Sequence, residues 1–214
     1  AKVNGINLVK DDEIGIFDGN VCVGTVILTK NLLTLGDGNI AASKAGADDG
    51  DTPDKDGYVK GNIISFKIYD ASEDEEIPIV VATFVSKLDL SVINPSPTFD
   101  PEITGFVSLT ATHNYTPKAK AGADKELLEG GSGSLDGYAS SDFEGSTLTY
   151  NWDDLDNIGL SATNVVNPSF TAPLVNKDTK YRVALTVNDG NRNSKPDTII
   201  VTVKQINYPP VANA

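Results

Sequence analysis

The sequence predicts an all-β chain of two tandem β-sandwich domains. None of its 214 residues lies in a sustained helical stripe of apolar side chains. Short runs rich in β-branched and aromatic residues instead alternate with turns rich in Gly, Pro, Asn and Asp. The clearest run is residues 147–152, where Leu148, Tyr150 and Trp152 alternate with polar residues. We expect a strand there, with the only tryptophan at the centre of a core.

The first domain is expected to contain hairpins at its Asn-Gly and Gly-Asn pairs. Asn4-Gly5 interrupts an apolar alternation, and Gly19-Asn20 separates two strand-like runs. Cys22 lies in the second of those runs, and we expect it to be buried because free cysteine behaves as a small apolar residue. The expected strands are residues 13–18, 21–28, 62–70, 77–85 and 103–112.

The second domain is expected to be an immunoglobulin-like sandwich that lacks the disulfide. Residues 118–121 and 125–128 are short strand candidates ahead of the tryptophan strand. Two long alternating runs, residues 181–187 and 199–203, follow it and are separated by an Asn-Asp-Gly turn at residues 188–190. A tryptophan strand followed by two such strands is typical of this fold.

Charge and composition exclude several classes of partner. The formal net charge is −13, from 17 basic and 30 acidic residues, so we expect no binding to nucleic acid, which needs clustered Lys and Arg. Divalent cations are the natural complement. No apolar run approaches the roughly 18 residues of a membrane helix, so we expect no membrane insertion. The single cysteine excludes an intramolecular disulfide.

A long acidic loop at residues 36–61 is a candidate calcium site. Its carboxylates alternate with Gly and Pro, and Ca²⁺ takes 6–8 oxygen ligands. The EF-hand template does not fit, because Ile63 stands where the bidentate glutamate belongs. A solvated acidic loop without metal is the alternative. The candidate ligands are Asp49, Asp51, Asp54 and Asp56.

Catalysis is not expected, because the chemistry it requires is sparse in this sequence. His113 is the only histidine and lies at the expected domain junction, and Cys22 is the only cysteine. Nucleophilic triads and ordinary zinc sites both need more of these residues. Carbohydrate binding is the stronger alternative and would use exposed aromatic rings. Its candidates are Tyr58, Tyr138 and Phe143, although each ring can also cover a turn or a linker.

Two resemblances suggest where this protein acts. Residues 11–24 (DDEIGIFDGNVCVG), with residues 56–72 and 98–111, resemble a β-sandwich module of bacterial secreted and surface proteins, here without the strand that normally precedes this run. Residues 121–152, 167–173 and 181–203 are similar to polycystic-kidney-disease-type (PKD-like) domains, which are extracellular spacer and adhesive modules, some of which bind calcium. The resemblance implies a second calcium candidate at Asp136, Asp142, Glu144 and Asp189, although the acidic turn at residues 142–146 lacks the family's proline and one carboxylate.

An internal repeat indicates a further domain boundary. Residues 115–121 (YTPKAKA) return as residues 208–214 (YPPVANA), 93 residues later. We therefore expect a first domain at residues 1–112, a linker at 113–118, a PKD-like domain at 116–207 and the start of a further copy at 208–214.

The expected function is that of a non-enzymatic, extracellular or cell-surface segment of a larger protein. It would act as a semi-rigid spacer or an assembling scaffold, with filament formation as one form of assembly. Its partners would be other copies of itself or neighbouring domains of the same parent chain. The alternative is a carbohydrate-binding accessory module of a secreted hydrolase, with polysaccharide as the partner. We expect no required cofactor other than the candidate calcium.

Overall fold

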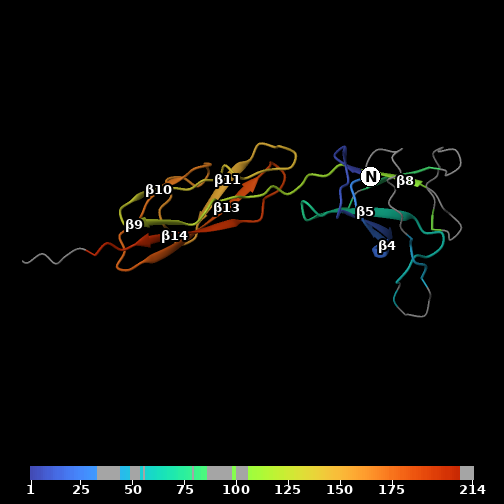
Figure 1. Ribbon diagram of the computed structural model, residues 1–214, viewed down its shortest axis with the longest axis horizontal. Helices are drawn as coiled ribbons and strands as arrows, with labels where there is room; N and C mark the ends of the chain where they lie inside the picture. Colours follow the sequence, from blue (N-terminus) through green and yellow to red (C-terminus); the bar gives the residue numbers. More distant parts are fainter. Residues whose placement is uncertain are drawn as a thin grey trace, which may run out of the picture. The chain divides into compact units, whose positions relative to one another are not determined.

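The computed structural model describes residues 1–32, 44–48, 54, 56–78, 80–85, 98–99 and 106–207 (Figure 1). The chain divides into unit 1, Ala1–His113, and unit 2, Asn114–Ala214. All regular elements in the described ranges are β-strands. The prediction of an all-β chain with two β-sandwich domains is therefore confirmed.

Unit 1 contains two four-stranded sheets, with strand orders β4-β3-β5-β6 and β2-β1-β8-β7. Its buried apolar residues include Ile14, Phe66 and Ile77 from the first sheet and Leu109 from the second. The rings of Phe66 and Phe84, one from each sheet, lie 6.0 Å apart between centroids. The strands are β1 (Lys2–Val3), β2 (Ile6–Asn7), β3 (Glu13–Asp18), β4 (Val21–Ile27), β5 (Ile64–Asp70), β6 (Glu75–Ile77), β7 (Val81–Val85) and β8 (Phe106–Ala111).

Both predicted hairpins of unit 1 are confirmed. Asn4 and Gly5 have φ angles of 48° and 81°, the left-handed values that a tight hairpin turn needs, and β1 pairs antiparallel with β2. Gly19 and Asn20 join β3 to β4 as predicted. On its other side β1 pairs in parallel with β8, so the N-terminal hairpin occupies that edge of the last strand.

Two predictions about unit 1 are wrong. Residues 77–85 do not form one strand: β6 ends at Ile77 and β7 begins at Val81, in the other sheet. Pro78 lies at the change of sheet, where it has no N–H to continue a ladder.

Cys22 is exposed rather than buried. A register shift between β3 and β4 leaves Val23 on the buried side of the strand.

Unit 2 is a sandwich of a four-stranded sheet, β11-β13-β14-β9, and a two-stranded sheet, β10-β12 (Figure 1). The predicted strand at residues 118–121 is wrong, because only an isolated bridge between Lys118 and Ser141 forms there. The strands are β9 (Lys125–Leu128), β10 (Ser132–Ser134), β11 (Thr149–Asp154), β12 (Ser169–Thr171), β13 (Thr179–Asn188) and β14 (Asp197–Lys204).

The core of unit 2 forms around Trp152, as predicted. Trp152 is 1% exposed, and its indole Nε1 donates to the carbonyl oxygen of Val165 at 2.9 Å. The alternating residues of β13 and β14 pack around it from the same sheet. The buried cluster also contains Ala119, Ala121, Leu135, Ile158, Phe170, Ala172, Val183, Leu185, Val187, Ile199, Val201 and Val203.

Two carboxylates hold the turn that follows β11. Asp154 accepts the backbone N–H groups of Ile158 and Gly159, both at 2.8 Å. Asp156 accepts two hydrogen bonds from the Arg182 guanidinium, each at 2.9 Å, and one from its backbone N–H at 2.8 Å. The hydrogen bonds from the Arg182 side chain, and then from its backbone, lower the pKa of Asp156 to about 2.

Replacing Trp152 with Ala should destabilise unit 2 by about 3–5 kcal/mol, because it leaves a large cavity and an unpaired carbonyl at Val165. Denaturant unfolding followed by circular dichroism measures the loss. Tyr138→Ala, at a side chain that is 71% exposed, is the control and should change stability by less than about 0.5 kcal/mol. Equal effects of the two substitutions would contradict the placement of Trp152 in the core.

The Asp156 carboxyl should titrate with a pKa of about 2 in the folded protein. Carbon-detected NMR at a series of pH values measures it. The folded-state pKa is below the unfolded one, so this group stabilises the fold above pH ~4 and loses that contribution as the pH falls toward ~2. Arg182→Gln should return the pKa of Asp156 toward 3.8. The pKa of Asp178, which the Lys204 side chain lowers, is the internal control and should not move.

Candidate functional site

The start of unit 2 brings together several of the residues singled out in the sequence. Tyr115 is 1% exposed, and its ring lies 4.5 Å from that of Phe143. The Glu144 carboxylate accepts the backbone N–H of Tyr115 at 3.3 Å. The Asn114 side-chain amide donates to Asp189 at 2.7 Å. Residues 114 and 115, expected in a linker, are therefore held by the fold of unit 2.

The four acidic residues of the second calcium candidate are occupied mainly by backbone N–H groups. Asp136 accepts from Tyr138, Asp142 from Ser146, and Asp189 from Asn191 and Arg192. The backbone hydrogen bond from Arg192 is the largest cause that lowers the pKa of Asp189. One oxygen of Asp142, Oδ2, is buried without a hydrogen-bond partner.

No metal-binding cluster is found in the described part of the chain. Among these residues, His, Cys, Asp and Glu side chains nowhere gather in groups of three or more that could hold an ion. Asp54 and Asp56 of the first candidate are exposed, while Asp49 and Asp51 lie outside the described residues. Calcium binding at either candidate stays a prediction.

Two of the three aromatic candidates pack against other rings. Tyr58 stacks on Phe99 with 4.7 Å between centroids and 10° between planes. Phe143 lies against Tyr115, as described above, and is 41% exposed. Tyr138 differs, because it projects from the turn after β10 and is 71% exposed. Of the three, Tyr138 therefore offers the most accessible ring to a ligand.

His113 is held in the fold of unit 1. Its Nε2 lies 2.8 Å from Glu75 Oε2, and its side chain is 8% exposed. The Asn4 amide brackets its backbone, accepting the His113 N–H at 2.9 Å and donating to its carbonyl at 2.8 Å. These contacts give His113 a structural role. A general base must reach its substrate, and this side chain is buried against Glu75.

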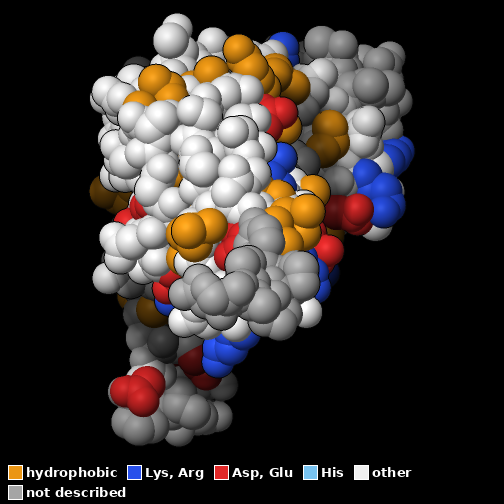
Figure 2. Space-filling model, turned by 90° about the vertical axis from the view of Figure 1, so that its left-hand side faces the viewer, with side chains coloured by type: hydrophobic (Ala, Val, Ile, Leu, Met, Phe, Trp, Pro, Cys, Tyr) orange, Lys and Arg blue, Asp and Glu red, His pale blue; other side chains and the backbone are white. Residues whose placement is uncertain are grey.

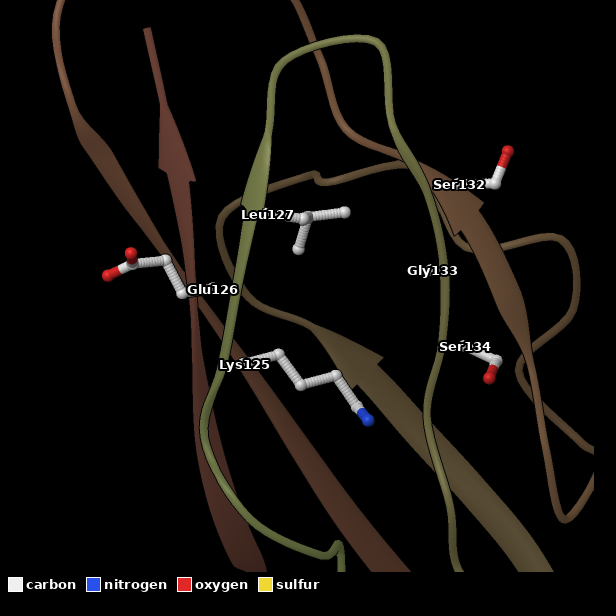
Figure 3. A pocket seen from close by; sticks show the side chains of 6 residues that line it. All are labelled: Lys125, Glu126, Leu127, Ser132, Gly133 and Ser134. Atoms are coloured by element: carbon white, nitrogen blue, oxygen red, sulfur yellow. The ribbon is translucent and has the colours of Figure 1, made fainter.

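A hollow of about 490 Å³ lies between β9 and β10 in unit 2 (Figure 3). Lys125 and Leu127 point from β9 toward β10, whereas Glu126 points to the opposite side of β9 (Figure 3). Gly133 borders the hollow from β10 and packs against the Phe170 ring, which a Cβ at this position would approach to 2.6 Å. Its lining therefore brings no acid–base pair together. The hollow is the gap between the edge strands β9 and β10 of the two sheets.

The surface carries scattered apolar side chains. Figure 2 shows them in several separate groups, with acidic, basic and other side chains between the groups. Among the large apolar side chains described in unit 2, the largest exposed fractions belong to Leu174, at 81%, and Tyr138, at 71%. No helix long and apolar enough to cross a membrane occurs among the described residues.

The sequence analysis missed Glu129, a carboxylate that is only 9% exposed. It accepts the backbone N–H of Val175 at 2.8 Å and that of Ile206 at 3.0 Å. It therefore joins the end of β9 to two segments far along the chain. Its position before Gly130-Gly131 marks a turn, but nothing in the sequence indicates which backbone groups it binds.

Comparison with known proteins identifies the family of unit 2. Residues 114–203 match the sequence model of the PKD domain. Chitinase A of Pseudoalteromonas piscicida is 41% identical over 64 residues, which are 30% of this chain and only 8% of Chitinase A.

Two solved structures are also similar. The PKD domain from the KIAA 1837 protein shares 30% identity, covering 44% of this chain and 92% of that one, with a TM-score of 0.36. A nucleoside hydrolase-related hypothetical protein from Saccharophagus degradans, associated with carbohydrate metabolism, shares 18% identity over 42% of this chain and 26% of its own, with a TM-score of 0.39. Together with the strand order and the Trp152 core, the family match shows that residues 114–203 form an immunoglobulin-like PKD domain.

Proposed function

We propose that this chain is a non-catalytic, extracellular segment of a larger secreted or surface protein, in which its β-sandwich units are load-bearing spacers. The PKD domain supports a non-catalytic module in unit 2. The similarity to Chitinase A, which covers 8% of that protein, supports a role as one module among others.

The observation that carries the proposal is the pairing of first and last strands in unit 2. β9 and β14 lie side by side in parallel, with Lys125 opposite Val201 and Leu128 opposite Lys204. Once the contacts of Asn114 and Tyr115 are broken, tension along the chain pulls on the start of β9 and on the end of β14, which are opposite ends of this pair. The load therefore shears the ladder, and its hydrogen bonds must break together rather than one after another.

Unit 1 repeats this arrangement at smaller scale. Its first strand, β1, pairs in parallel with its last, β8, with Lys2 opposite Thr110 and Val3 opposite Ala111. In both units the first strand is thus paired with the last strand across one parallel ladder. Such a pairing resists tension along the chain, which is what a spacer between domains requires.

Targeting to a polysaccharide is a second candidate function. The observation that favours it is the exposed ring of Tyr138, because sugar rings stack their C–H faces on aromatic side chains. The similarity to Chitinase A also supports it. In that role the chain would hold a neighbouring catalytic domain against its substrate.

Breaking the β9–β14 ladder should lower the force at which unit 2 unfolds. The Glu129 N–H donates to Lys204, so by alternation the N–H groups of Leu127 and Lys125 face β14 and that of Glu126 faces away. Lys125→Pro should therefore lower the unfolding force in single-molecule pulling experiments, because proline removes a ladder N–H. Glu126→Pro is the matched control and should retain more of that force. Equal losses in the two variants would count against the load-bearing role.

The second candidate predicts that the chain binds an insoluble polysaccharide and that Tyr138→Ala weakens this binding by about tenfold or more, equivalent to about 1.4 kcal/mol. Pull-down on chitin, cellulose and xylan measures it. Tyr58→Ala is the control, since Tyr58 is stacked on Phe99. Retention of the wild-type chain by none of these polysaccharides would remove this candidate and leave the spacer proposal in place.

A further inference from the structure

Two large apolar side chains are exposed at the end of unit 2 from which the chain leaves. Leu128 is 57% exposed and Leu174 is 81% exposed. Because β9 runs parallel to β14, Leu128 lies opposite Lys204, the last residue of β14. We call the surface formed by Leu128 and Leu174 the exit surface.

Hydrogen bonds join the parts of the exit surface into one structure. The turn after Leu128 bonds to the segment before Leu174, through Gly130 N–H to the Ala172 carbonyl at 2.8 Å. Glu129 then accepts both the Val175 and the Ile206 N–H groups. The course of the chain is therefore fixed relative to both leucines as far as Ile206.

The sequence directly after Ile206 repeats the start of unit 2. Asn207-Tyr208 repeats Asn114-Tyr115, again 93 residues apart. In unit 2 these are the first two residues of the fold: Asn114 donates to Asp189, and Tyr115 is 1% exposed. The preceding unit ends at His113, so no residue separates the two units along the chain.

We infer that the exit surface is the docking surface for a further domain of the unit 2 type, which begins at Asn207. Ile206 is anchored by Glu129, and the repeated sequence begins at the next residue. Successive residues advance the chain by at most about 3.6 Å each, so the two folds must lie in contact. This inference rests on the proposed role as a spacer between domains.

Unit 2 itself indicates what the docked domain presents. Its own starting end carries Phe143, which is 41% exposed beside the buried Tyr115. An equivalent apolar residue in the following domain would meet the two leucines of the exit surface. Burial of apolar side chains at this junction would make the row of domains stiffer. It would also explain why two leucines are exposed here, since apolar surface in contact with water costs free energy.

The test compares the 214-residue chain with a chain extended after Ile206 by a second copy of residues 114–207. Leu174→Ser in the first copy should lower the melting temperature of the extended chain by at least about 4 °C more than that of the 214-residue chain. Tyr138→Ser in the first copy is the matched control, because this exposed side chain follows β10, which runs back from the exit surface. Its effect should be the same in both chains.

Equal effects of Leu174→Ser in the two chains would overturn the docking surface. A second extended chain, with six Gly-Ser residues inserted after Ile206, guards against misfolding of the direct fusion. Docking predicts that the direct fusion folds and that the inserted linker abolishes the additional effect of Leu174→Ser. Folding of the second copy only when the linker is present would also overturn the inference. Because none of these measurements applies force, a failure here is distinguishable from failure of the load-bearing role.

Discussion

The pairing of the first strand with the last organises both units. In unit 2 the parallel β9–β14 ladder joins the two ends of the chain, and the core around Trp152 fills the space that this sheet encloses with β10 and β12. In unit 1 the two-residue β1 makes the equivalent contact with β8. Such pairing brings together residues 76 positions apart in unit 2 and 108 positions apart in unit 1, so each unit is held by long-range contacts. Because this ladder fixes the positions of both chain ends in each unit, a neighbouring domain starts from a defined position.

Several of the chain's carboxylates serve its own fold. Asp12, Asp18, Asp70, Asp189 and Glu129 are buried, and each accepts hydrogen bonds from backbone N–H groups in turns and loops. Loops that lack regular pairing need such partners, because a buried N–H without an acceptor is costly. Burial raises the pKa of Asp12, while hydrogen bonds from Val9 and Ala71 act in the opposite direction. In unit 2, Asp189, one of the candidate calcium ligands, thus also holds the backbone of a turn.

The sequence predicted single strands better than it predicted their neighbours. Period-2 alternation located β11, β13 and β14, while turn residues and β-branched or aromatic runs located β3, β4 and β5. The Asn-Gly turn at residues 4 and 5 predicted the first hairpin. It failed at residues 77–85, where a continuous apolar run crosses from one sheet to another at Pro78. It also failed at Cys22, because a register shift decides which side of β4 faces the core. Period alone cannot show where a strand changes its partner.

By itself, the sequence determined the all-β class, the two sandwiches, the core position of Trp152 and the resemblance of the second domain to PKD domains. These follow from local alternation, turn residues and motif order, which act over a few residues. Only the tertiary structure decided that β9 and β14 pair in parallel, that Glu129 binds Ile206, and that Leu128 and Leu174 flank the exit of the chain. The physical reason is distance along the chain: these contacts join segments that the sequence separates by 30 or more residues, and local patterns carry no information about which distant backbone groups a side chain will reach.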